Sequence, residues 1–487
     1  MSDKRFLKLS FSCAIAALAA ACTVGPNYHR PPAPVPPAFK EPPPGEWKTA
    51  QPRDTALRGK WWEVFGDPQL NALEEQVNVS NQRIAEAEAQ FRGARAAVKL
   101  ARAGLFPTVT AGAAVTESRA AASRTGASNG TSQSGTTTVY QLPVDFTYEA
   151  DVWGRVRRTI EENVANAQAS AADVETVRLS LQAELAIDYF QLHGFDEQQR
   201  ILNQAAAAYE KALQVIINRH DQGVVSGIDV AQAQAQLETT RSQGIDVTAA
   251  RAQLEHAIAI LTGKPPSELT IPPAPIGVAP PVVPLALPTE LLERRPDVAG
   301  AERRMAAANA QVGVATAAYY PSLTISASAG FASTTLSHLL SLPNRFWSLG
   351  PALVATVFDG GRRRAVTEQA EAGYDAAVAA YRENVLTAFQ DVEDNLSTLR
   401  ILADEAKQQA VAVAAAERAL ALAENRYRGG ITSYLEVITA ENVALINERT
   451  AVDLRIRQMT ASVNLVKALG GGWSTAELPA GGTLVAR

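Results

Sequence analysis

Cysteine, histidine and aromatic residues are scarce in this sequence. Among its 487 residues there are two cysteines and five histidines, and phenylalanine, tryptophan and tyrosine together make up 6%. Both cysteines, Cys13 and Cys22, lie near the N-terminus, so no disulfide framework is expected to stabilise the rest of the chain. The histidines are scattered without the spacing of metal ligands, and we therefore expect no metal site.

Patterns typical of catalysis and of nucleic-acid binding are also missing. Gly263-Lys264 lacks the upstream glycine of a phosphate-binding loop, and no nucleophile and base form a recognisable constellation. The net charge is −5, and no basic stretch has the spacing of nucleic-acid contacts. We expect a protein that is not an enzyme, does not bind nucleic acid and needs no cofactor.

The first 21 residues have the features of a secretory signal peptide. A basic start precedes an apolar core over 11–21, which is too short to span a bilayer as a helix. Cys22 follows a stretch that resembles a bacterial lipobox, with Ala19 where leucine is usual. We expect cleavage before Cys22, a covalent lipid on Cys22, and sorting to the outer membrane because Thr23 rather than aspartate follows. The alternative is an ordinary signal peptide with an incidental cysteine.

The rest of the chain contains an internal duplication. Residues 219–230 match 426–437 at an offset of 207, which also pairs Gly154 with Gly361 and Gly263 with Gly470. Upstream the offset is 214, so the first copy has seven extra residues, expected within 118–138. The duplication predicts an extended lipidated segment over 22–60, repeat 1 over 61–263, a proline-rich linker over 264–290, repeat 2 over 291–470 and a tail over 471–487.

Four segments alternate between apolar and polar residues, at about 107–118, 140–152, 321–332 and 346–358. In the second, Leu142 and Phe146 fall on one face, and the acids Asp145, Glu149 and Asp151 fall on the other. Such alternation is typical of strands that face lipid on one side and a polar lumen on the other. We expect the three acids to line the lumen and to favour cations modestly. The alternative is a half-buried strand of a soluble sandwich, for which the chain offers no second sheet.

Each pair of strands precedes a helix of about 68 residues, over 154–221 and 361–428, which corresponds to ~100 Å. A sharp glycine-containing tip follows each, at 219–230 and 426–437. A second helix then continues to about 262 or 469. Apolar residues spaced seven apart predict coiled-coil packing between these antiparallel helices. A single helix is expected from Pro68 to about Gly104. An isolated coiled-coil rod is the alternative, but it does not account for the strands.

Four strands cannot close a barrel, and an open edge would leave unpaired backbone groups in lipid. Three chains together would supply twelve strands, an even number within the range of outer-membrane barrels. The expected fold class is therefore membrane α+β, in which a trimeric 12-stranded transmembrane β-barrel continues into a periplasmic α-helical coiled-coil barrel. Each chain would contain two tandem structural repeats.

Several motifs in combination carry a family resemblance: Trp61-Trp62 through Asp67-Pro68, Arg294 to Val298, Tyr320 to Leu323, and both tips. The chain resembles outer-membrane efflux factors of the TolC/OprM type, in the lipoprotein branch that works with resistance-nodulation-division (RND) pumps. The resemblance implies a homotrimeric channel in the outer membrane of a Gram-negative bacterium. It would extend into the periplasm, dock on a periplasmic adaptor and an inner-membrane RND transporter, and pass small molecules outward. The alternatives are the exit duct of a type I protein secretion system and a lipidated coiled-coil scaffold without a pore.

The resemblance also implies functional residues at the tips. Glu436 matches an acid of the ring that narrows the periplasmic mouth, and Asp229 and Tyr427 match residues that tie the tips together. The family's second acid falls on Thr439 and its arginine on Thr432, so this gate network departs from the pattern. Compensation of a helix dipole is the alternative role of Glu436 and Asp229. The expected adaptor contacts, for which ordinary turn chemistry is the alternative, are Gly223, Val224, Ser226, Gly430, Ile431 and Ser433.

Overall fold

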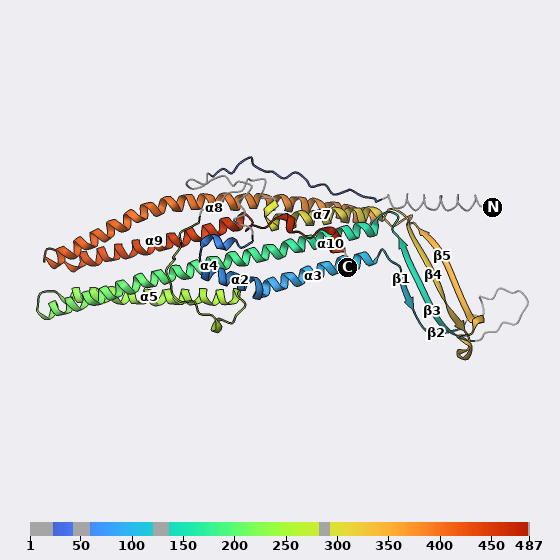
Figure 1. Ribbon diagram of the computed structural model, residues 1–487, viewed down its shortest axis with the longest axis horizontal. Helices are drawn as coiled ribbons and strands as arrows, with labels where there is room; N and C mark the ends of the chain where they lie inside the picture. Colours follow the sequence, from blue (N-terminus) through green and yellow to red (C-terminus); the bar gives the residue numbers. More distant parts are fainter. Residues whose placement is uncertain (1–22, 42–58, 120–135, 282–292, 486–487) are drawn as a thin grey trace, which may run out of the picture.

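The computed structural model describes residues 23–41, 59–119, 136–281 and 293–485. Long helices lie side by side along an elongated molecule, and a β-sheet lies at one end (Figure 1). The predicted signal peptide and Cys22 lie outside the described residues. Within the described ranges, no helix is apolar enough over a sufficient length to cross a membrane.

The same order of elements occurs twice along the chain. The first set consists of α2 (Pro68–Ser80), α3 (Gln82–Ala103), β1 (Thr108–Ala111), β2 (Ala114–Arg119), β3 (Thr136–Ala150), α4 (Arg155–Asp221) and α5 (Gly227–Leu261). The second consists of α7 (Pro296–Ala317), β4 (Ser322–Ser333), β5 (Arg345–Val354), α8 (Arg362–Arg428) and α9 (Tyr434–Ala468). The short helices are η2 (Trp61–Phe65), η4 (Pro266–Glu268), η5 (Leu336–His338), η6 (Leu342–Asn344), η7 (Thr475–Glu477) and α10 (Gly481–Val485). Equivalent helices have equal lengths: 22 residues in α3 and α7, 67 in α4 and α8, and 35 in α5 and α9.

The single helix expected from Pro68 to about Gly104 is wrong, because Asn81 divides it into α2 and α3. Asn81 has extended backbone angles, and its side-chain oxygen accepts a hydrogen bond from the Arg83 amide at 2.9 Å. Its side-chain amide donates to the carbonyl of Leu261 at 2.8 Å. An asparagine that bonds backbone groups in this way favours a helix start over a helix interior. The break therefore joins the start of α3 to the end of α5.

The strands form one antiparallel sheet in the order β1-β3-β4-β5, and β2 also pairs with β3. β1 and β2 keep a common register on β3 but are separated where Gly112 faces Pro143. The Gly112 amide donates to the Pro143 carbonyl at 3.0 Å, and Pro143 has no N–H to return the bond. β5 ends at Val354 rather than near 358, because Val354 pairs with Ser322, the first residue of β4.

The register sorts the residues of the sheet into apolar and polar rows. One row joins Val109, Phe146, Ala327 and Leu349, and the next apolar row joins Ala111, Val144, Ala329 and Trp347. Between them lies the polar row of Thr110, Asp145, Ser328 and Ser348. Directly opposed residues share a face, and neighbouring rows point to opposite faces. One face of the sheet is therefore apolar, and in the single chain it is exposed: Trp347 is 77% exposed and Leu349 66%.

Gly330 on β4 lies in close contact with the backbone of β3. It pairs with Pro143, and a Cβ at this position would overlap the backbone oxygen of Leu142. We expect Gly330→Ala to destabilise the sheet by about 1–3 kcal/mol, because an added methyl group has no room there. A Cβ added at Gly350 on β5 would meet open space, so Gly350→Ala is the matched control. The melting temperature of the strand signal in circular dichroism should fall for Gly330→Ala and stay at the parent value for Gly350→Ala. Equal melting temperatures of the two variants would contradict this prediction.

The main hydrophobic core lies at mid-length (Figure 1), where η2 and α2 pack against α4 and where buried side chains of α5, α7, α8 and α9 belong to the same cluster. Trp61 is 1% exposed and donates its indole N–H to Gln182 at 3.0 Å. Arg295, the residue before α7, joins three helices. It donates hydrogen bonds to Asp297 on α7 at 2.6 Å, to Asp391 on α8 at 2.9 Å and to the carbonyl of Ala468 on α9 at 3.3 Å. The Arg294 to Val298 motif is thus a structural junction at the start of α7.

An extended segment, residues 23–41, runs along the helices toward the sheet (Figure 1). Its first part is held where the sheet meets the helices: the Val24 amide donates to the Trp153 carbonyl at 3.1 Å, and Arg158 donates to Asn27 at 2.9 Å. Its far end is held at mid-length, where the Lys40 and Glu41 amides bond Glu393 at 2.6 and 2.9 Å. We refer to residues 23–41 as the strap.

Candidate functional site

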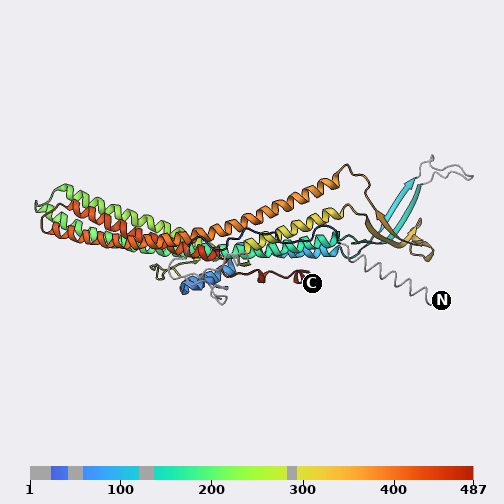
Figure 2. The ribbon, with the colours of Figure 1, turned by 90° about the horizontal axis from the view of Figure 1, so that it is seen from above.

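Two helical hairpins end in tips at the extremity opposite the sheet (Figures 1 and 2). Hairpin 1 consists of α4 and α5, and hairpin 2 of α8 and α9. Each tip turns on a glycine in the left-handed region, Gly223 (φ 73°) and Gly430 (φ 71°). In each tip the residue after this glycine donates its amide to a carbonyl five residues back: Val224 to Arg219 at 2.9 Å and Ile431 to Arg426 at 3.0 Å. This is the hydrogen bond of a glycine-terminated helix end, and it leaves Val224 and Ile431 67% and 72% exposed.

Asp229 serves as a helix cap. Its carboxylate accepts a hydrogen bond from the Ser226 amide at 3.0 Å, and the Ser226 hydroxyl accepts one from the Ile228 amide at 3.0 Å. These two bonds form a capping box at the start of α5. The structure therefore favours the helix-end role of Asp229 over a tie to Tyr427.

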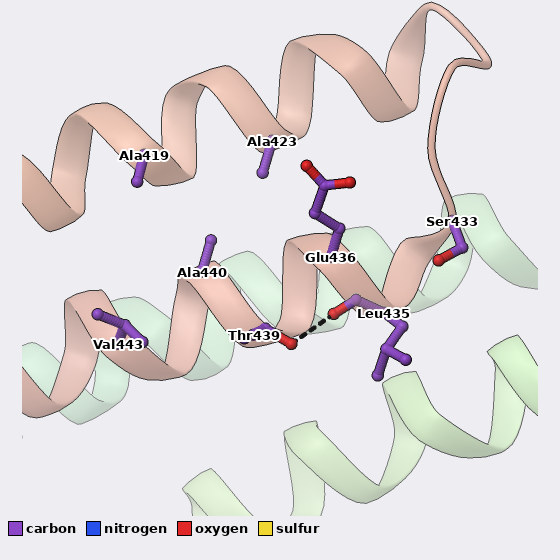
Figure 3. Close-up of a pocket in the computed structure, with 8 residues that line it drawn as sticks. All are labelled: Ala419, Ala423, Ser433, Leu435, Glu436, Thr439, Ala440 and Val443. Atoms are coloured by element: carbon purple, nitrogen blue, oxygen red, sulfur yellow. Dashed lines mark hydrogen bonds between the residues drawn. The ribbon is translucent and has the colours of Figure 1, made fainter.

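Glu436, the counterpart of Asp229 in hairpin 2, has different partners. Its carboxylate accepts from Arg426 at 2.8 Å and from the Thr432 hydroxyl, so its charge is compensated within its own tip. The side chain lies in an open groove between α8 and α9, beside Ala423 and Ala440 (Figure 3). Thr439, which falls at the position where the resemblance implies a second acid, donates its hydroxyl to the Leu435 carbonyl at 2.8 Å.

Tyr427 links the two hairpins through its ring. The Arg219 guanidinium of hairpin 1 lies 5.0 Å from the ring centroid, and the Tyr434 ring lies at 5.3 Å. The Tyr427 hydroxyl is buried and has no hydrogen-bond partner, so the expected bond to Asp229 is not formed within this chain. A cation–π contact of about 0.5–2 kcal/mol takes its place. Arg219 could have been found from the sequence, since it is the repeat counterpart of Arg426.

The three acids expected in the barrel lumen have separate environments. Asp145 lies in a polar row of the sheet, opposite Thr110 and Ser328. Glu149 lies near the end of β3 and accepts two bonds from Arg155, at 2.9 and 2.6 Å.

Asp151 lies one residue beyond the end of β3, so it is not part of the strand expected to reach about 152, and its place in the lumen stays a prediction. Its carboxylate accepts from the amides of Val156 and Arg157 at 2.9 and 3.0 Å, at the start of α4. A negative charge there is stabilised by the free amides of the first helical turn.

Residues 73–264 and 287–471 match the family model described as outer membrane efflux protein, and together they make up more than half of the chain. The chain belongs to the outer membrane efflux protein family.

The similarity to known proteins extends over most of this efflux protein. The pyoverdine export outer membrane protein OpmQ of Pseudomonas aeruginosa is 31% identical over 436 residues, which cover 89% of this chain and 92% of that protein. The probable efflux pump outer membrane protein TtgC of Pseudomonas putida is 31% identical over 455 residues, which cover 93% of each. The solved structure of the outer-membrane channel OprN has a TM-score of 0.83 at 33% identity and covers 93% of this chain and 100% of that chain.

This efflux protein is accordingly the outer-membrane channel of a tripartite efflux system. Its tips and its sheet occupy opposite ends of the molecule (Figure 1), as a channel that connects a periplasmic opening with the outer membrane requires. In the part of the chain that the structure describes, no three metal-binding side chains come together.

Proposed function

We propose that this efflux protein is a lipid-anchored homotrimer that closes a 12-stranded transmembrane β-barrel and continues it into a periplasmic helical barrel. It would conduct small molecules that an inner-membrane RND pump and a periplasmic adaptor deliver. Each chain would contribute two structural repeats and four strand positions. The observation that carries the proposal is the sorting of the sheet into an exposed apolar face and a polar face.

The edges of the sheet support the trimer. β1 and β2 lie at one edge and β5 at the other, and neither edge has a further partner within the described chain. Unpaired N–H and C=O groups are costly in lipid, so each edge requires a neighbouring chain. Three chains with four strand positions each make an even twelve, which is a size that closed outer-membrane barrels adopt.

The strap supports a lipid on Cys22. It begins at Thr23, next to Gly154 at the junction of sheet and helices. In the proposed trimer this junction is the periplasmic boundary of the membrane, because the apolar rows of the strands end there. An acyl chain on the preceding residue would enter the inner leaflet without straining the strap.

The tips support an adaptor contact. The exposed side chains of Val224 and Ile431 project at the end of the molecule that faces the pump, and apolar side chains at such a position suit a helical partner. Gly223, Ser226, Gly430 and Ser433 form the same turns. We expect Glu436 and Tyr427 to hold the mouth narrow, through the contacts described above.

Purified trimer in planar bilayers should conduct ions in discrete steps, and its migration on a gel should change when the sample is heated. Conducting, heat-modifiable protein would support a closed barrel, and a protein that neither conducts nor shifts would instead be a coiled-coil scaffold. Deletion in the native host separates the remaining alternatives: sensitivity to small toxic compounds supports the efflux role. Loss of a secreted protein with unchanged sensitivity would show a type I secretion duct.

A further inference from the structure

The two hairpins contact each other near their tips through a small apolar cluster. Ile216 and Ala233 of hairpin 1 pack against Ala423, Tyr434 and Val437 of hairpin 2. Next to this cluster, the side-chain amides of Gln236 and Asn442 exchange hydrogen bonds of 2.9 and 3.1 Å. We refer to this contact as the hairpin seam.

Glu441 on α9 is a carboxyl group buried in the hairpin seam. It is 7% exposed, and its Oε2 atom has no hydrogen-bond partner. It lines a cavity of about 360 Å³ between the hairpins, together with Tyr427 and Tyr434 of hairpin 2 and with Ile216 and Arg219 of hairpin 1. The unpartnered Tyr427 hydroxyl belongs to the same cavity. The hairpin seam thus contains two buried polar atoms without a hydrogen-bond partner, Glu441 Oε2 and the Tyr427 hydroxyl oxygen.

The charged neighbours of Glu441 do not neutralise it. The cations around the cavity are Lys211 and Arg219 on α4 and Arg428 on α8, and the neighbouring acid is Glu424 on α8. The phenols nearby are Tyr209, Tyr427 and Tyr434, and the nearby polar group of α5 is Gln236. Arg428 is paired with Glu424 at 2.7 Å, and Arg219 lies over the Tyr427 ring. Burial first, and then the charge of Glu424, raise the pKa of Glu441 to about 7.

We propose that Glu441 is a proton-operated latch between the two hairpins. With Glu441 neutral, the two hairpins keep the contacts of the hairpin seam described above. With Glu441 ionised, the unpaired charge needs water, which favours a state in which the hairpins separate near the tips and the cavity is hydrated. That this separation widens the periplasmic mouth rests on the proposed function; the latch itself does not.

The direction of the pH dependence follows from proton binding. The closed seam holds its proton up to about pH 7, whereas a hydrated Glu441 would ionise near the ordinary value of 4.5. The closed state is therefore fully favoured below about pH 4.5 and loses population as pH rises from there to about 7. The change is at most about tenfold per pH unit for each carboxyl group, and it levels off above pH 7.

The latch can be tested by a distance measurement within one chain. Spin labels on Val224→Cys and Ile431→Cys report the separation of the two tips, and dilution with unlabelled chains keeps the measured pairs within one chain. The distance should lengthen between pH 5 and pH 8 in the parent and stay short at both pH values in Glu441→Gln, which keeps the shape of the neutral acid. Glu238→Gln is the matched control, because Glu238 is an exposed residue of α5 paired with Arg241, and it should behave like the parent.

Two outcomes would overturn the latch: a parent distance that does not change with pH, or a Glu441→Gln variant that lengthens as the parent does. Conductance recorded on the same samples tests the proposed function separately. If the tips separate with pH but the conductance does not change, the latch stands and its role in opening the mouth fails. If both change in the parent and neither changes in Glu441→Gln, both proposals are supported.

Discussion

Replacing Gly470 by alanine is expected to lower the free energy of unfolding by about 2–5 kcal/mol, the largest effect of any single methyl group that we predict. Two costs add at this position. Gly470 has φ = 92°, where an L-residue with a side chain is strained. Its new Cβ would also overlap the carbonyl oxygen of Arg294, a backbone atom held in place by the start of α7. The chain therefore cannot turn from α9 past α7 unless this residue is a glycine.

The duplication provides an independent repetition of the test. Gly263, the counterpart of Gly470, has φ = 73°, and its Cβ would overlap the carbonyl oxygen of Ser80 just before α3. Thermal unfolding in detergent, followed by circular dichroism, should show a large loss for either variant. Gly93→Ala within α3 is the control, because its Cβ would point into open space and alanine favours a helix by about 1 kcal/mol. Melting of Gly470→Ala at the temperature of the parent would disprove the close approach.

Glu436→Ala is expected to increase ion conductance more than any other single change at the tips. The variant removes two hydrogen bonds at once, from Arg426 and from Thr432. These bonds hold the tip of hairpin 2 against the start of α9. Because the two charged side chains are 54% and 40% exposed, solvent screening limits the pair to about 1 kcal/mol. A change of that size shifts a closed–open equilibrium about fivefold in each chain. Single-channel recording in planar bilayers should show a higher open fraction.

Two neighbouring variants make this measurement specific. Thr439→Ala, one turn along α9, removes a hydroxyl that bonds only its own helix, and it should leave the conductance unchanged. Asp229→Ala removes the capping box of α5, at about 1 kcal/mol of helix stability, and should raise the conductance less than Glu436→Ala does. If Glu436→Ala and Asp229→Ala both conduct like the parent, neither acid contributes to a gate.

The elements that the sequence predicted most closely are the long helices and the strand faces. The helix expected over 154–221 is α4, Arg155–Asp221, and the one expected over 361–428 is α8, Arg362–Arg428. The break at Asn81 was missed because the apolar spacing continues across it, and only the bond to Leu261, 180 residues away, explains the turn there. The end of β5 was misplaced for a similar reason, since a strand continues only as far as its neighbour does.

The acids near the tips also show the difference between what the sequence predicts and what only the tertiary structure explains. Asp229 and Glu436 occupy equivalent positions of the two repeats, yet one caps a helix and the other pairs with Arg426. Glu441 was not singled out from the sequence, although its position on the buried face of α9, seven residues after Tyr434, offered a signal. A charged residue among core positions at helical spacing is a reason to look for a buried site.

The sequence alone determined the duplication, the order of helices and strands, and the residues that share each face. It could do so because these features are periodic over a few neighbouring residues. Only the tertiary structure decided which partner each carboxylate has, where Asn81 breaks a helix, and that Glu441 lies unpaired between the hairpins. A hydrogen bond or an ion pair forms only when two groups come within a few ångströms, and that separation is fixed by the packing of long helices whose contacts are distant in sequence.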